Sequence, residues 1–284
     1  MSSSEKKAVF IGRSFVRVVN VSDKEQSSRA EKTVSYTKET FTDVLREILS
    51  EEGVFRYILS EELVYVTTLF FPLDIKLTRE LVRIAAEESV PEDLQKTEWD
   101  FRAMQYVKHQ EKEGKNVVQV AVIAHDFSKK LEGVFRAGVR VESILPESYV
   151  LAFLEGHDED LKVIVRKDQE KMLFLAIKQE VVLHTVVRET TSDPEVDFEK
   201  FISFVERASS EKVQRGIISG WKNQGMQSKI EERGLIYSEK EYDLFSGIFL
   251  ESISGRDQQV LNLSVSGGQK KFFWWQRFFS RNAR

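Results

Sequence analysis

Three consecutive stretches decide the fold of this chain: residues 63–72 read LVYVTTLFFP, residues 80–91 read ELVRIAAEESVP, and residues 99–101 read WDF. The first is rich in β-branched and aromatic residues and ends at proline, which predicts a strand. The second carries apolar residues at helical spacing and stops at a valine-proline pair, which predicts a helix. The third begins another predicted strand. The order strand, helix, strand indicates a small α/β unit.

The same periodicity predicts further elements on both sides of this unit. Because strand hairpins alternate with helices, we expect an α/β or α+β protein with mixed sheets. The sequence shows no internal repeat, and the polar stretch from Ser22 to Lys32 predicts a loop. The predicted strands are 9–21 (a hairpin turning near Gly12-Arg13-Ser14), 62–71, 99–108, 117–124, 139–144, 161–166, 173–177 and 181–188, and the predicted helices are 37–51, 77–89, 126–135 and 197–208.

Composition narrows the possible chemistry. The chain has 284 residues, of which 41% are hydrophobic and 11% aromatic, ample for a packed core. It has no cysteine, which excludes disulfides, thiolate catalysis and zinc held by cysteine. The histidines do not pair at ligand spacing, so we expect no metal site. The apolar stretch that follows residue 7 is too short for a signal peptide, and no stretch reaches eighteen apolar residues, so we expect a soluble, intracellular body.

The last eighteen residues differ from the rest of the chain. They carry six aromatic side chains and no acid, and as a helix they place most of the aromatic residues on one side. Roughly 12 helical residues reach about 18 Å, well short of the ~30 Å hydrocarbon core, so the segment suits a membrane surface and not a span. The residues of this predicted anchor are Lys270, Lys271, Phe272, Trp274, Trp275, Arg277, Phe278, Phe279 and Arg281.

The distribution of charge along the chain supports the predicted membrane anchor. The chain nets −4 and the tail +5, so the remainder carries −9. Anionic lipid attracts such cations, and tryptophan favours the interfacial layer. A helix that docks on its own domain or on a partner is the alternative. We expect no nucleic-acid binding, because the acidic body would repel phosphate.

The motifs quoted above, in their order, resemble the type IV pilus assembly protein PilM. In that family a strand ends in proline, a glutamate-bearing helix follows and stops at an apolar-proline pair, and an aspartate-aromatic strand comes next. The likeness continues at 120–124 and at Ala137-Gly138-Val139, and more weakly at 244–250 and 260–263. It covers about residues 8 to 265 and is most specific between 62 and 145.

The resemblance implies an actin-like ATPase fold related to FtsA and to secretion proteins of the GspL type, with two ribonuclease-H-like lobes and a small inserted α/β subdomain. The implied first lobe comprises residues 8–61 and 141–160, and the inserted subdomain comprises 62–140. A shortened second lobe would span 161–265, and 266–284 would form the linker and tail.

In the resembled family, nucleotide sits between the lobes on two strand-turn-strand loops of the form Asp-x-Gly followed by Ser or Thr. Here the first loop keeps Gly12, Arg13 and Ser14, but Phe10 stands where the family has the metal-holding aspartate. The second loop, within 163–171, has no glycine, so side chains would block close phosphate approach. The adenosine-side motif is reduced to Ser219-Gly220 followed by Trp221. We therefore expect a pseudo-ATPase with no catalytic residue, no metal and no cofactor, with ATP and magnesium disfavoured.

The resemblance also implies a scaffold on the cytoplasmic face of the inner membrane that binds the cytoplasmic peptide of a PilN-like protein, with homo-oligomerisation possible. Residues 260–265 resemble that peptide motif, and are either the last strand of the second lobe or a segment that occupies the peptide groove in cis. Two alternatives remain: an FtsA-like membrane tether of a filament or division complex, and an active ATP-binding switch in which Asp168 would be the candidate carboxylate.

Overall fold

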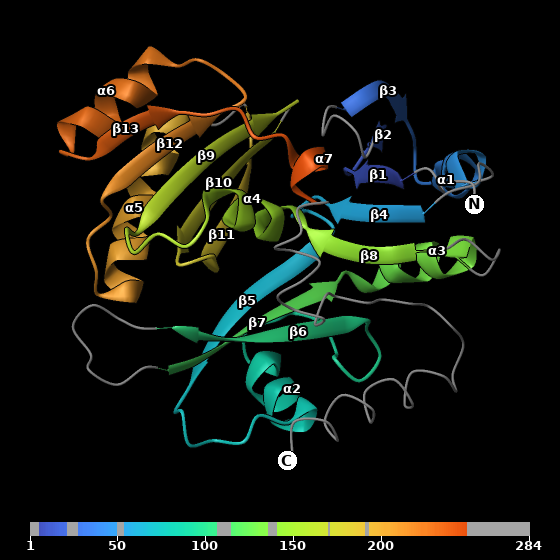
Figure 1. Ribbon diagram of the computed structural model, residues 1–284, viewed down its shortest axis with the longest axis horizontal. Coiled ribbons are helices and arrows are strands. Elements are labelled where there is room, and N and C mark those ends of the chain that lie inside the picture. Colours follow the sequence, from blue (N-terminus) through green and yellow to red (C-terminus); the bar gives the residue numbers. More distant parts are fainter. Residues whose placement is uncertain are drawn as a thin grey trace.

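The computed structural model of the chain contains two five-stranded sheets and one three-stranded sheet (Figure 1). The residues that the structure describes are 6–21, 28–49, 54–106, 115–135, 141–169, 171–190 and 193–248.

The first five-stranded sheet has the order β3-β2-β1-β4-β8. Its first three strands are antiparallel and the remaining pairs are parallel. Helices α1 (Phe41–Leu49) and α3 (His125–Phe135) pack together through Phe41 and Phe127, whose ring centroids lie 5.3 Å apart. We call this unit the first lobe. Its strands are β1 (Lys6–Ile11), β2 (Phe15–Val21), β3 (Ser28–Ser35), β4 (Val54–Leu59) and β8 (Val141–Pro146).

The second five-stranded sheet repeats this topology. Its order is β11-β10-β9-β12-β13, again three antiparallel strands followed by parallel pairs. Helices α5 (Pro194–Ser209) and α6 (Gln224–Glu232) bury Phe198 and Ile230 in its core. We call this unit the second lobe. Its strands are β9 (Lys162–Asp168), β10 (Lys171–Lys178), β11 (Val181–Glu189), β12 (Arg215–Ser219) and β13 (Ile236–Glu239).

The three-stranded sheet is formed by the part of the chain between β4 and α3. At the equivalent place in the second lobe, between the parallel strands β12 and β13, the chain has only α6. Its order is β5-β7-β6, and α2 (Arg79–Glu87) covers one face. The Thr78 hydroxyl caps α2 by accepting from the Leu81 N–H at 3.2 Å. We call this unit the insertion. Its strands are β5 (Val64–Phe71), β6 (Trp99–Tyr106) and β7 (Lys115–Ile123).

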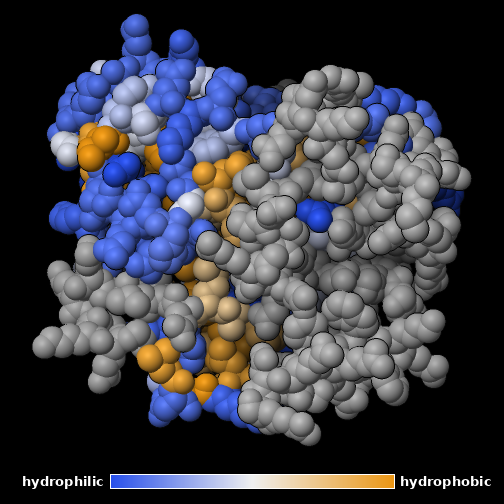
Figure 2. Space-filling view, viewed as in Figure 1, coloured by the Kyte–Doolittle hydropathy of each residue, from blue (hydrophilic) through white to orange (hydrophobic). Residues whose placement is uncertain are grey.

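Hydrophobic side chains gather unevenly on the surface. Figure 2 shows mostly hydrophilic residues over the part of the second lobe that holds α6 and β13, interrupted by a small hydrophobic patch, and hydrophobic residues lower down, over the insertion. Ile236 on β13 is 59% exposed. The insertion exposes large apolar side chains on and just after β5, where Phe70 is 47% and Leu73 51% exposed. A soluble fold normally scatters such residues, so this surface is a candidate contact region.

Two segments connect the lobes. Helix α4 (Glu147–Glu155) runs from β8 to β9, and the chain returns after β13 to α7 (Leu244–Gly247), which packs on α4. Both segments contribute to the core that the first lobe shares with the inner face of the second sheet. The lobes are therefore hinged at one edge.

The hydrophobic pattern located most elements but missed several. The expected hairpin over 9–21 and the helices within 77–89 and 126–135 are confirmed. The loop expected from Ser22 to Lys32 is wrong at its end, because β3 begins at Ser28 and pairs with β2. The short strands β4, β12 and β13 and the helices α4 and α6 were not predicted. The strands are too short to show a clear period, α4 is buried along six consecutive residues, and α6 buries only Met226 and Ile230. The turn 137–139, the segment 260–265 and the anchor 270–281 lie outside the described residues.

Candidate functional site

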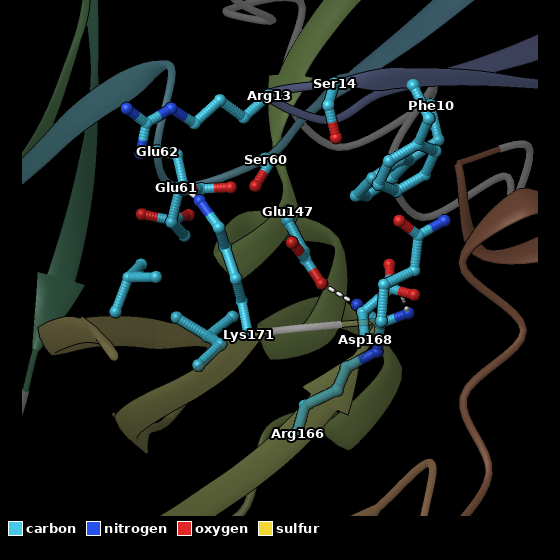
Figure 3. Close-up of a pocket in the computed structure, with 14 residues that line it drawn as sticks. Phe10, Arg13, Ser14, Ser60, Glu61, Glu62, Glu147, Arg166, Asp168 and Lys171 are labelled. Carbon is cyan, nitrogen blue, oxygen red and sulfur yellow. Dashed lines mark ion pairs between the residues drawn. The ribbon is translucent and has the colours of Figure 1, made fainter. Parts of the chain in front are cut away.

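The turns β1–β2 and β9–β10 face each other across the gap between the two lobes (Figure 3). They border a cavity of about 160 Å³, well below the ~300–1,000 Å³ of typical ligand sites. Figure 3 shows side chains from both lobes pointing into this one space. The lining residues are Phe10, Arg13, Ser14, Phe15, Ser60, Glu61, Glu62, Glu147, Arg166, Asp168, Gln169, Lys171, Leu173 and Val187.

The first turn is filled by aromatic rings. A Cβ on Gly12 would lie 2.5 Å from the Phe15 ring, and Phe10 stacks on Phe15 with centroids 5.7 Å apart. The Gly12 N–H donates to the Phe15 carbonyl at 2.9 Å, and the Gly12 carbonyl accepts from the Tyr36 hydroxyl. Glycine is therefore needed here to admit the Phe15 ring, and its N–H is already used within the hairpin.

The second turn has the expected strand-turn-strand form. It joins β9 to β10, and Gln169 takes φ 49° without being glycine. Asp168, the candidate carboxylate of an ATP-binding switch, lines the cavity. Its oxygens lie 3.7 Å from an Arg17 nitrogen and 3.9 Å from an Arg166 nitrogen. Two of the chain's own cations therefore lie close to this carboxylate.

Ion pairs join the two lobes across the cavity. Glu147 at the start of α4 pairs with Arg166 on β9, and Glu62 after β4 pairs with Lys171 on β10. The Glu147 and Arg166 side chains are only 6% and 12% exposed. Burial on this scale reduces screening by water and salt, so these contacts are stronger than surface pairs.

Glu61 is a second buried carboxyl of the site, beside Glu147. Its Oε1 accepts the Ser148 N–H at 2.9 Å, which caps the first turn of α4, where the N-cap residue Pro146 offers no side-chain bond. Burial raises the pKa of Glu61 to about 7, and hydrogen bonds from Ser148 and Thr185 offset part of that rise. The cleft thus contains a carboxyl that titrates near neutrality.

Ser219 and Gly220 do not line the cavity with Arg13 and Ser14. They end β12, where Ser219 pairs with Arg166. Gly220 has φ +80°, and a Cβ there would lie 2.5 Å from the Lys167 carbonyl oxygen. The Lys167 ammonium lies over the Trp221 ring, 5.3 Å from its centroid. This glycine is explained by backbone geometry and close packing against β9.

Magnesium and ATP do not fit the described cleft. Phe10 has no side-chain oxygen at the first turn, and Gln169 puts a side chain in the second turn. Of the carboxyl groups that line the cavity, Glu62, Glu147 and Asp168 lie beside arginine or lysine, and Glu61 is hydrogen-bonded to Ser148. Among the described residues, no cluster of three histidines or carboxylates could hold a metal. We therefore derive no chemical step through a nucleotide.

A second contact joins the lobes, and the motifs gave no signal for it. Thr68, Gln119 and Arg102 form a row across β5, β7 and β6. Arg102 Nε donates to Gln119 Oε1 at 2.7 Å, and its Nη2 donates to the Glu180 carbonyl at 2.9 Å in the β10–β11 turn. Thr68 donates to the Val182 carbonyl. The insertion is thereby bonded to the second lobe.

The Arg102 guanidinium also stacks on α4. Its centre lies 4.5 Å from the Phe153 ring centroid and 5.0 Å from that of Tyr149. Arg102 is 5% exposed and Gln119 is fully buried. A buried, fully bonded cation over two rings is a strong structural contact.

The predicted anchor residues, from Lys270 to Arg281, lie outside the described residues. Within the described part of the chain, no helix is both long and apolar enough to cross a membrane.

Comparisons with known proteins relate the fold to assembly proteins. No protein-family model matches the chain, and no curated protein matches it. The structure of a PilM-PilN type IV pilus biogenesis complex matches with TM-score 0.62 and 14% identity, over 86% of this chain and 89% of that one. The cytoplasmic domain of EpsL, an inner-membrane component of the type II secretion system of Vibrio cholerae, matches with TM-score 0.58 and 11% identity, over 91% of this chain and 98% of that one.

A third structure, from Bacteroides thetaiotaomicron and described as an actin-like ATPase fold of unknown function, matches with TM-score 0.54 and 9% identity, over 89% of this chain and 96% of that one. Likeness at such low identity concerns architecture alone. Together with the repeated five-stranded topology of the two lobes, it establishes that this chain has the actin-like ATPase fold.

Proposed function

We propose that this protein is a non-catalytic, PilM-like scaffold of a type IV pilus or type II secretion-like assembly platform at the inner membrane. The observation that carries the proposal is the cleft: aromatic rings and internal ion pairs occupy the place where this fold would hold a nucleotide. A fold that keeps its architecture without an open phosphate cradle is suited to binding and not to catalysis.

The proposed partner is an extended cytoplasmic peptide of a PilN-like membrane protein. One of the matching structures is a PilM-PilN complex. Strands β8 and β6 are edge strands of their sheets, and an edge strand can pair with an extended peptide while pockets take alternate side chains. We place the peptide region on this side of the molecule.

The proposed membrane contact uses the basic aromatic tail and would keep the scaffold at the cytoplasmic face of the membrane. Co-sedimentation with vesicles of anionic lipid tests it. The full chain should pellet with the vesicles at low salt, and a version ending at Gly268 should stay in the supernatant. Equal pelleting of both versions would remove the tail from the proposal and leave the peptide-binding scaffold to be tested separately.

Calorimetric titration tests the scaffold directly. The full chain is titrated with a synthetic peptide from the cytoplasmic segment of a PilN-like protein, with a scrambled peptide as control, and separately with magnesium-ATP. We expect saturable heat with the peptide and none with the scrambled peptide or with ATP. Micromolar ATP binding would favour the active switch instead. If the peptide does not bind but the chain binds vesicles through its tail, the results would favour an FtsA-like tether.

A further inference from the structure

The hinge between the lobes is tied by one buried carboxylate. Glu155, at the end of α4, is 1% exposed and accepts from Lys162 Nζ at 2.9 Å. It also accepts from Lys240 Nζ at 2.5 Å and from the Tyr242 hydroxyl, both in the returning segment. The two crossings between the lobes are thus bound to each other, which fixes the axis about which the lobes could open.

Three ion pairs lie at the cavity, two of them between the lobes and one between the connecting helix α4 and the second lobe. In each pair one partner belongs to the first lobe or its boundary with the insertion or α4, and the other to β9 or β10 of the second lobe. Both signs of charge come from both sides. The pairs are Arg17–Asp168, Glu147–Arg166 and Glu62–Lys171.

We infer that these three ion pairs add to the shared hydrophobic core in holding the lobes closed without any nucleotide, so that the cleft is an internal latch in which the chain's own charges bridge the two halves. The physical reason is that opposite charges at close range in a partly buried cleft attract more strongly than they would in water. Opening of the cleft would separate Arg17–Asp168 and Glu62–Lys171, which join the two lobes directly, whereas Glu147 belongs to the connecting helix α4. The inference rests on the cleft geometry and not on the proposed partner, so failure of peptide binding leaves it intact.

The distance between the lobes tests the latch. Because the chain has no cysteine, two exposed positions can be labelled uniquely: Lys38→Cys in the first lobe and Lys200→Cys in the second. Electron–electron double resonance between spin labels then reports the separation. In wild-type background we expect one narrow distance that does not change on adding magnesium-ATP, and a longer, broader distribution in about 1 M salt, where the screening length falls to about 3 Å.

Charge reversal sharpens the test. In Lys171→Glu the labels should move apart, because the new carboxylate faces Glu62 and Glu61. The swap that combines Lys171→Glu with Glu62→Lys should restore the narrow distance, which a merely misfolded variant could not do. Lys167→Glu is the matched control, since Lys167 lies over Trp221 on the other side of β9.

Two results would overturn the latch: a distance that neither salt nor Lys171→Glu changes, or a closed distance that appears only with magnesium-ATP. If Lys171→Glu fails to fold, the salt titration of the wild-type chain decides alone, with unchanged separation in about 1 M salt counting against the inference.

Discussion

Besides the shared hydrophobic core, two polar contacts join the second lobe to the rest of the chain, and they are built from different chemistry. The cleft contact uses ion pairs around a cavity, with Lys171 26% exposed. The insertion contact uses Arg102, Gln119 and Thr68, which bond to backbone carbonyls of the β10–β11 hairpin in a buried layer. Because the insertion contact is more deeply buried than the cleft contact, we expect it to contribute more to the free energy of unfolding. We expect the cleft contact to respond more strongly to salt and pH.

The largest expected effect breaks the insertion contact. Arg102→Ala removes two hydrogen bonds and the stacking on Phe153, and leaves the Glu180 carbonyl without that donor. We expect a loss of about 3–5 kcal/mol in the free energy of unfolding, measured by urea denaturation.

Arg79→Ala is the matched control for Arg102→Ala. Arg79 stacks on Trp99 at 4.0 Å, donates to the Trp99 carbonyl at 2.7 Å and pairs with Asp100 at 3.3 Å. It is 52% exposed, so its loss should cost less than that of Arg102, about 1–2 kcal/mol. Equal losses for the two variants would mean that the buried row does not dominate the insertion contact.

A pH prediction concerns Glu61 in the cleft. Its pKa in the folded protein is about 7 against an ordinary 4.5, so the folded state holds the proton more tightly than the unfolded state. The resulting stability is fully present below about pH 4.5 and is lost as pH rises through 7. Glu61→Gln keeps the acceptor for Ser148 and removes the titration. We expect it to be more stable than the wild type at pH 8 by up to roughly 3 kcal/mol, with little difference at pH 5.

Thermal melts of both proteins from pH 5 to pH 8 check this expectation. Parallel pH profiles for wild type and Glu61→Gln would show that Glu61 does not titrate in the cleft as proposed.

A smaller effect is expected at the first turn. Gly12→Ala places a methyl group against the Phe15 ring, and overpacking of this kind costs typically ~1–3 kcal/mol. In a Phe15→Leu background the cost should shrink, because the clash partner is gone. Calorimetric melting of the four proteins of this cycle measures the coupling. A cost that is unchanged in the Phe15→Leu background would mean that the glycine serves some purpose other than admitting the ring.

The smallest effect concerns a single ion pair of the cleft. Lys171→Met leaves Glu62 without its partner and should cost about 1 kcal/mol at low salt and less in about 1 M salt. Lys32→Met is the control: Lys32 and Glu47 are 57% and 70% exposed, so its loss should lie within about 0.5 kcal/mol at any salt. Denaturation at both salt concentrations measures the difference. A Lys171→Met cost that does not depend on salt would argue against an electrostatic cleft.

Sequence reasoning located the long elements, and its interpretation of the two turns as altered phosphate loops stays a prediction. The hydrophobic runs of β5, β9, β10 and β11 and the amphipathic α2 were located because each is long enough to display its period. The sequence also shows Phe10 at the position where the resembled family has aspartate. The short strands β12 and β13 could not be located in the sequence, and the two similar lobes were expected only from the family resemblance, since equivalent strands of the two lobes share geometry and not residue identity.

Sequence alone determined which residue types this chain has at the two turns, and hence that a metal-holding carboxylate is missing from the first. It could not determine what fills the space. Only the tertiary structure brought Glu147 against Arg166 and Arg102 against Glu180, because partners that lie 19 and 78 positions apart meet only when sheets, hinge and insertion are in place. The local sequence pattern determines helices and strands through short-range sterics and hydrophobic periodicity. The pairing of charges and of buried polar groups depends instead on distances that the whole fold sets.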